Sequence, residues 1–269
     1  MSLRIQNNVE AFNAHRNLVG TSGKLAKSME RLSSGYRINR AADDAAGLAI
    51  SEKLRGQIGG LAQAERNAQD AVSLVQTAEG SLTEIHAMLQ RVRELAVQYK
   101  NGSLSATDRT AIQSEVNQLG SEIERIGVSA EFNGIQLLSS ASAITFQVGS
   151  NDGEQISVST ISLGQALGAG TVQLTQAGTT DISEIDSAID AVSTQRATFG
   201  AVQNRLEYTM NNLAIYRENL VSSESRIRDV DMAEEMVNFT KLQILQQAGT
   251  SMLAQANSSS QSVLSLLRG

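Results

Sequence analysis

The sequence contains no cysteine, proline or tryptophan, and aromatic residues make up only 3% of its 269 residues. The absence of cysteine excludes disulfide bonds, zinc–thiolate sites, iron–sulfur clusters and thiol nucleophiles. The 2 histidines are too few for a histidine-rich metal site. Because large aromatic anchors are scarce, any core must be built mainly from aliphatic side chains. The sequence therefore predicts no metal, no cofactor and no catalytic site.

Concentrated positive charge and long apolar runs are also missing. The formal net charge is −6 at pH 7, and the cations form no cluster of the kind that binds nucleic acid. No apolar run approaches the ~20 residues of a membrane-spanning helix, and the segment from Met1 to Asn8 lacks the apolar stretch of a secretory signal. The sequence predicts no nucleic-acid partner and no membrane insertion, and any export would need a route that does not read such a signal.

What the sequence does contain is a sustained heptad pattern. Apolar residues alternate three and four positions apart at Leu61, Ala64, Ala68, Ala71, Val75, Ala78, Leu82, Ile85, Leu89, Val92, Ala96 and Tyr99. This spacing indicates one long helix of a coiled coil. The helix is expected to begin after Asp43 and Asp44, whose charge suits a helix N-terminus, and to end at Asn101 and Gly102. A helix of about 55 residues would be roughly 80 Å long, which is too long for a small globular protein.

Further elements follow this helix along the sequence. Capping residues from Ser105 to Asp108 begin a shorter helix, which should return antiparallel to the long one. Alternating apolar residues on either side of a turn at residues 149–153 predict a small β-hairpin region. From Ile182 to Leu220 the spacing of three and four resumes, which indicates a second long helix.

The two ends of the sequence are helical in pattern but more apolar than one helical face requires. The first carries Ile5, Val9 and Phe12, and the last, after capping residues 229–231, carries Phe239, Leu245, Val263, Leu264, Leu266 and Leu267. A helix with apolar residues on several faces needs several neighbours, and one chain supplies too few. The excess predicts association with other copies of the chain, in a ring or a helical filament.

The predicted fold is mainly α: an elongated antiparallel coiled-coil helical bundle with a small β-hairpin region and two terminal helices that pack in a helical assembly. Its expected divisions are an N-terminal helix at 1–40, the long rod helix and return helix at 41–130, the hairpin region at 131–180, the second rod helix at 181–225, and the C-terminal helix at 226–269.

The stretch from Arg31 to Arg55 (RLSSGYRINRAADDAAGLAISEKLR) closely resembles bacterial flagellins. Residues 89–98, 131–134, 254–257 and 263–268 resemble the same family. The resemblance implies a structural, non-enzymatic subunit that self-assembles into the filament of the bacterial flagellum and serves swimming motility outside the cell. It also implies that the terminal helices form the filament's inner core, while the rods and hairpin form the surrounding layer.

The resemblance implies partners as well. Copies of the same chain form the polymer, filament cap and junction proteins adjoin it, and export passes through the flagellar type III channel. A flagellar export chaperone would hold residues 231–267 before export. A host Toll-like receptor that senses flagellin would contact the face matched by Arg91, Leu95 and Glu115, and cytosolic immune sensors would read the C-terminal leucines.

Other interpretations stay open at this point. Hook–filament junction proteins have similar termini, and a closed dimeric or tetrameric coiled-coil module would show the same heptads. An enzyme would need a site in the hairpin region, where Asp152 and Glu154 are the available carboxylates, but no nucleophile and base converge there in the sequence.

Overall fold

The chain forms two compact units, each of which is described by itself. The computed structural model describes residues 8–162 and 181–268, with Asp181 and residues 260–268 described by their backbone alone. Residues 1–56 and 219–269 form one unit, which we call the terminal unit, and residues 57–218 form the other, the middle unit.

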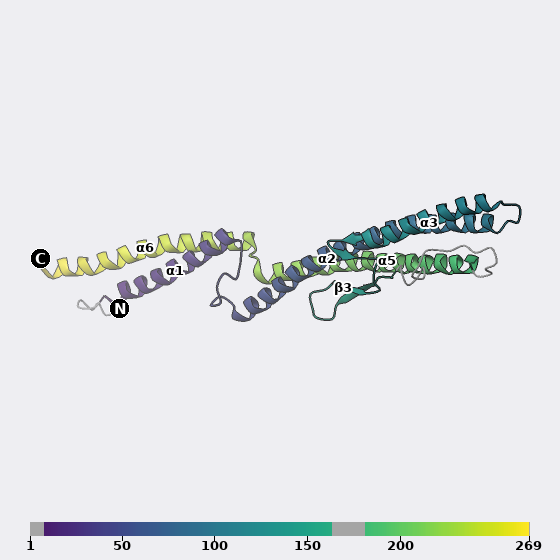
Figure 1. Cartoon of the computed structure of the whole chain (residues 1–269). Helices are drawn as coiled ribbons and strands as arrows, with labels where there is room; N and C mark the ends of the chain where they lie inside the picture. The colour runs from purple at the N-terminus through teal and green to yellow at the C-terminus, as the bar shows by residue number, and fades with distance from the viewer. Residues whose placement is uncertain (1–7, 163–180, 269) are drawn as a thin grey trace. The chain divides into compact units, whose positions relative to one another are not determined.

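Helices account for most of the described chain, with two short two-stranded sheets, and the predicted mainly α fold is confirmed. The elements in chain order are labelled in Figure 1, and their bounds are α1 (Val9–Ser34), α2 (Ala45–Tyr99), α3 (Ala106–Ser129), β1 (Glu131–Phe132), β2 (Ile135–Gln136), β3 (Ala143–Gln147), β4 (Gln155–Ser159), α5 (Asp181–Arg228) and α6 (Met232–Arg268).

The heptad seam of α2 forms the centre of the middle unit. From Leu61 to Ala96, each apolar residue of the predicted seam is at most 2% exposed. The seam packs against apolar residues of α3 and α5, namely Ile112, Val116, Ile123, Ile185, Val192, Phe199 and Leu206. Alternating spacing keeps one stripe of each helix turned toward its neighbours, which is why the sequence pattern located this core.

The helix starts follow the predicted capping chemistry, whereas α2 ends at Tyr99 and Gly102, expected to end it, does not have a left-handed φ. The Asp44 side chain accepts a hydrogen bond from the Gly47 amide (2.9 Å) at the start of α2. At the start of α3, the Ser105 hydroxyl accepts from the Asp108 amide, while the Asp108 carboxylate accepts from the Ser105 amide. This reciprocal pair satisfies amide groups that would otherwise lack a partner at a helix N-terminus.

The hairpin that the alternating residues predicted is present, and the described residues contain a second short hairpin before it. Strands β3 and β4 pair antiparallel around the expected turn, with Phe146 opposite Ile156, and the β4 residues Ile156 and Val158 are buried. Strands β1 and β2 form a second hairpin, whose turn residues Asn133 and Gly134 both have positive φ (50° and 77°). Such angles are those of a tight two-residue hairpin turn. The rest of the predicted hairpin region, residues 163–180, lies outside the described residues.

Helices α1 and α6 pair antiparallel in the terminal unit (Figure 1). Buried or half-buried residues recur every three or four positions on both helices, at Ala11, Ala14, Leu18, Thr21, Leu25, Ser28 and Leu32 on α1, and at Phe239, Leu242, Gln246, Gly249, Leu253 and Ala256 on α6. Small residues bring the two backbones close together: a Cβ atom at Gly249 would lie 3.2 Å from the Leu18 side chain. Near one end of the pair, the Asn8 side-chain Nδ2 donates to the Ala256 carbonyl (2.9 Å).

A backbone bridge joins the two connections of the terminal unit. Residues 35–37, after α1, pair with residues 228–230, at the end of α5 and just after it, and Tyr36 lies opposite Asp229. The Arg37 amide donates to the Arg228 carbonyl (2.7 Å), and the Val230 amide donates to the Gly35 carbonyl (3.0 Å). Gly35 ends α1 with a φ of 75°, a left-handed angle that glycine adopts without strain.

Candidate assembly and partner-binding surfaces

Large apolar side chains are exposed along α1 and α6 of the terminal unit. Phe12 is 71% exposed and Val237 is 69% exposed, although each is on a helix that pairs with another. The others of this kind on α1 and α6 are Val9, Val19, Met29, Met232, Met236, Ile244, Leu245 and Met252. Contiguous exposed apolar surface of this kind marks an interaction site.

The residues predicted to form the filament core are placed differently by the structure. Val9, Phe12 and Leu245 are exposed, whereas Phe239 is half-buried. Ile5 lies outside the described residues, and so do the side chains of Val263, Leu264, Leu266 and Leu267. The apolar surface is therefore present on both terminal helices within the described part of the chain.

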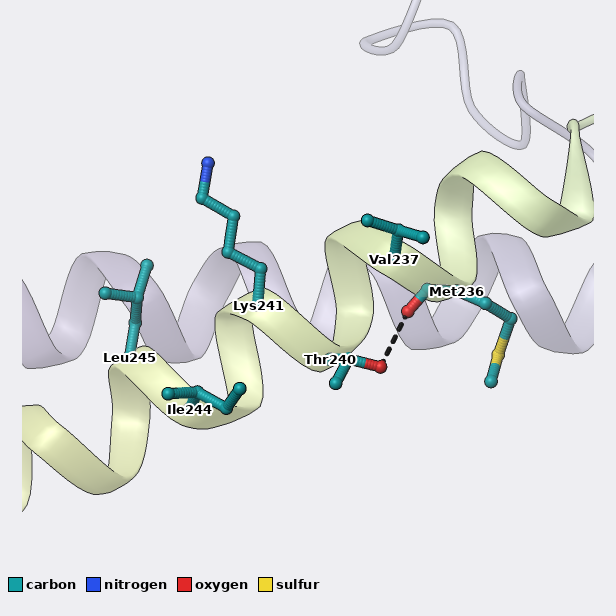
Figure 2. Close-up of a pocket in the computed structure, with 6 residues that line it drawn as sticks. All are labelled: Met236, Val237, Thr240, Lys241, Ile244 and Leu245. Carbon is teal, nitrogen blue, oxygen red and sulfur yellow. Dashed lines mark hydrogen bonds between the residues drawn. The ribbon is translucent and has the colours of Figure 1, made fainter.

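A shallow groove of about 520 Å³ lies on α6 alone. Its lining is mainly apolar and comes from two rows of residues spaced four apart, so they follow the turns of the helix (Figure 2): Met236, Thr240 and Ile244, and Val237, Lys241 and Leu245. The Thr240 hydroxyl donates to the Met236 carbonyl (2.9 Å), so the one hydroxyl of the groove is satisfied by its own helix. The groove suits apolar side chains of another polypeptide.

A second groove, of about 740 Å³, follows the pairing of α1 with α6. It has a more polar lining than the first, including Glu10, Asn13 and Asn17 from α1, with Leu245 and Met252 from α6. The two grooves share Leu245, so apolar surface continues from one to the other. A partner segment that covers this surface would contact both terminal helices.

The predicted receptor face on the middle unit contains an exposed ion pair. The Arg91 guanidinium donates to the Glu115 carboxylate through Nη2 (2.9 Å) and Nε (3.1 Å), and to Glu94 through Nη1 (3.1 Å). The hydrogen bond to Glu115, and to a smaller extent the one to Glu94, raises the pKa of Arg91. The structure thus brings together two of the three predicted residues and links α2 to α3.

The third predicted residue, Leu95, lies in the core. Its side chain is 2% exposed and packs in a cluster with Val92, Val116 and Ile185. Leu95 is one turn after Arg91, but α3 and α5 cover it. The part of this face that a partner can reach in the isolated chain therefore includes Arg91 and Glu115, while Leu95 supports them from below.

The ion pairs between separate segments of the chain were not predicted from the sequence. Arg93 donates to Asp186 (2.6 Å), which joins α2 to α5 and lowers the pKa of Asp186. In the terminal unit, Lys27 pairs with Asp43 (2.6 Å). The pKa of Asp43 is lowered to about 2, mainly by the hydrogen bond from Lys27 and to a smaller extent by the one from the Arg40 amide. Pairs so distant in sequence leave no local pattern.

One carboxylate of the hairpin turn, that of Glu154, has a structural role. Glu154 accepts hydrogen bonds from the Asn151 amide and side chain (both 3.1 Å), which hold the turn closed and lower the pKa of Glu154. Among residues 8–162 and 181–268, no group of three or more histidine, cysteine or acidic side chains is arranged to hold a metal ion. No helix in the described part of the chain is both long and apolar enough to cross a membrane.

Comparison with known proteins supports a filament-forming structural class. Residues 5–145 match the family described as the bacterial flagellin N-terminal helical region, and residues 182–267 match the bacterial flagellin C-terminal helical region. The flagellin of Bacillus subtilis (strain 168) is 49% identical over 99% of this chain and 100% of its own length. The flagellar filament 33 kDa core protein of Treponema phagedenis is 47% identical over 98% of this chain and 99% of its own length.

A solved structure agrees with these relatives. The crystal structure of Bacillus cereus flagellin superposes with a TM-score of 0.51 at 35% identity, covering 55% of this chain and 88% of that one. The exposed terminal helices and the packed middle unit define a self-assembling structural protein. The chain belongs to the bacterial flagellin family. It is a structural, non-enzymatic subunit of the extracellular flagellar filament, and the junction-protein and closed coiled-coil alternatives are set aside.

Proposed function

We propose that subunits join through the exposed apolar faces of α1 and α6, so that these two helices form the inner core of the filament. The observation that carries this proposal is the crowding of large exposed apolar side chains on these two helices. Burying such surface between copies removes it from water, which is the dominant favourable term in most protein association. A contact that uses different surfaces on the two partners can repeat without closing and so builds a helical filament.

The other divisions of the chain follow from this arrangement. Residues 1–40 and 226–269 are assigned to the inner core, and residues 41–130 and 181–225 to rods of the surrounding layer. The hairpin region, 131–180, belongs to the same layer. Support comes from the dense burial of the α2 seam, because a unit that satisfies its own apolar surface does not need neighbours to fold.

A cytoplasmic export chaperone is the proposed partner of residues 231–267 before assembly. The groove on α6 offers it Val237, Ile244 and Leu245, whose exposure would otherwise favour premature association. A partner that binds the unassembled chain lowers the concentration available for polymerisation by mass action. Filament cap and junction proteins would contact the same helices at the ends of the polymer.

A host Toll-like receptor is the proposed reader of the middle unit at Arg91 and Glu115, with Leu95 beneath them. Both charged side chains are about half exposed, and their mutual hydrogen bonds fix the guanidinium in one orientation. A planar, preoriented guanidinium can pair with a carboxylate of a partner with little further loss of side-chain entropy.

Matched substitutions test the assembly proposal. Val237→Asp places a charge on the exposed face of α6, and Val97→Asp makes the same change at a valine of α2 that is 52% exposed in the middle unit. Short filament seeds mixed with each monomer, followed by electron microscopy, should show elongation by the Val97 variant and little or none by the Val237 variant. Equal elongation by the two variants would contradict the proposed interface.

A further inference from the structure

The methionines are unevenly placed in this chain. The sequence has 7 methionines and no cysteine or tryptophan, so methionine is its most readily oxidised type of side chain. Four of them are exposed on α1 and α6 of the terminal unit: Met29, Met232, Met236 and Met252. Met88 and Met210 are instead half-buried against the core of the middle unit. Among the methionines that the structure describes, the most exposed side chains are thus those on the proposed assembly surface.

We propose that these four methionines are an oxidation site through which a hydroperoxide blocks assembly of the unassembled subunit. The thioether sulfur attacks the terminal oxygen of the hydroperoxide, and the O–O bond breaks as the S–O bond forms. Sulfur loses two electrons to become a sulfoxide. The peroxide is reduced, and its remaining oxygen takes up the proton and leaves as water or an alcohol.

The surroundings of Met236 explain why this change would matter. Its side chain forms part of the α6 groove with Val237 and Ile244 (Figure 2), and the only charged lining residue is Lys241. A sulfoxide oxygen is a strong hydrogen-bond acceptor, and burying it without a donor is costly. Met252 lines the neighbouring groove, so oxidation there places a second polar group in the same continuous surface.

The inference rests on the proposed assembly surface. It adds that the methionines are more accessible to an oxidant in the free subunit than in the filament. In the free subunit these four residues are 49–65% exposed. In a filament that buries α1 and α6, a hydroperoxide cannot reach them as easily. Oxidation would therefore act on subunits before they join and leave existing filaments largely unmodified.

The test exposes full-length monomer and intact filaments to hydrogen peroxide and measures the sulfoxide at each methionine by peptide mass spectrometry. In the monomer, the exposed methionines should oxidise several-fold faster than the half-buried Met88 and Met210; the exposed set is Met29, Met232, Met236 and Met252. The same four methionines should oxidise more slowly in filaments than in the monomer. Oxidised monomer should elongate seeds about tenfold more slowly than untreated monomer. Treatment with methionine sulfoxide reductases should restore the rate.

Matched variants separate this proposal from the assembly proposal. A variant with leucine at positions 29, 232, 236 and 252 keeps apolar surface of similar volume and should elongate seeds at the same rate with and without peroxide. Elongation by a control with Met88→Leu and Met210→Leu should remain sensitive to peroxide.

Loss of elongation by the peroxide-treated four-leucine variant, or full elongation by oxidised wild type, would overturn the proposal of an oxidation site. If the untreated four-leucine variant fails to assemble, reductase repair of oxidised wild type decides the question, and failed repair overturns the proposal. Failure of untreated wild type to elongate seeds would instead count against the assembly proposal.

Discussion

The middle unit and the terminal unit use long apolar helices in opposite ways. In the middle unit, the α2 seam and Phe199 of α5 are almost wholly buried. In the terminal unit, α1 and α6 cover each other along a seam rich in small residues and leave Phe12 and Val237 exposed. The comparison shows that similar apolar patterns can either complete a core within one chain or leave surface for other copies, depending on how many neighbours the chain provides.

The largest expected effect tests this contrast with phenylalanine. Phe199→Ala should lower the free energy of unfolding by about 3–5 kcal/mol, because it empties a site within the core. Phe12→Ala should change that free energy by about 0.5 kcal/mol or less, because Phe12 is an exposed side chain. Urea unfolding of depolymerised protein, followed by circular dichroism, measures both. The Phe12 variant should nevertheless elongate seeds more slowly, and similar stability losses in the two variants would remove the distinction between the units.

A second prediction separates packing from recognition within the middle unit. Leu95→Ala should cost about 2–5 kcal/mol of unfolding free energy, because Leu95 is buried beside Val116. Arg91→Ala should leave the unfolding midpoint nearly unchanged, because the pair with Glu115 is exposed and screened by solvent. Receptor signalling by monomer should fall in the Arg91 variant although its fold is intact. Unchanged signalling in that variant would show that the receptor does not contact Arg91.

The smallest expected effect concerns pH. The folded-state pKa of Asp43, about 2, lies below its ordinary value of 3.8, so this carboxylate contributes stability above pH 3.8 that is lost as the pH falls toward 2. Asp43→Asn should lower thermal stability at neutral pH and reduce its dependence on pH between about 4 and 2. Asp186→Asn, at an exposed pair in the middle unit, provides a comparison with a weaker expected effect. Circular dichroism melting across this pH range is the measurement, and an unaltered pH dependence in the Asp43 variant would contradict the role of its pair with Lys27.

The sequence was sufficient where one interaction repeats at a fixed spacing. The α2 seam and the Ser105 capping box could be predicted because each depends on residues a few positions apart. The β1–β2 hairpin was missed because its strands have two residues each and show no alternation, although the Asn133-Gly134 pair at its turn is itself a hairpin signal.

The burial of Leu95 also required the structure, because the covering residues come from α3 and α5, far along the chain. The helical spacing of α2 places Leu95 near Arg91, but it does not show how much of the α2 surface is covered by α3 and α5. The same limit applies to Met236 and Ile244, since only the paired arrangement of α1 with α6 identifies which apolar residues stay exposed.

The bridge between Tyr36 and Asp229 has a mechanical consequence. It ties two stretches of backbone far apart in sequence, and the Arg228 guanidinium adds a second tie by stacking 4.9 Å from the Tyr36 ring and donating to Glu52 (2.8 Å). A tensile load that reaches either connection is therefore shared by the other. A rotating fibre loads each of its subunits repeatedly, and parallel hydrogen bonds that must yield together resist such loading better than bonds that yield one at a time.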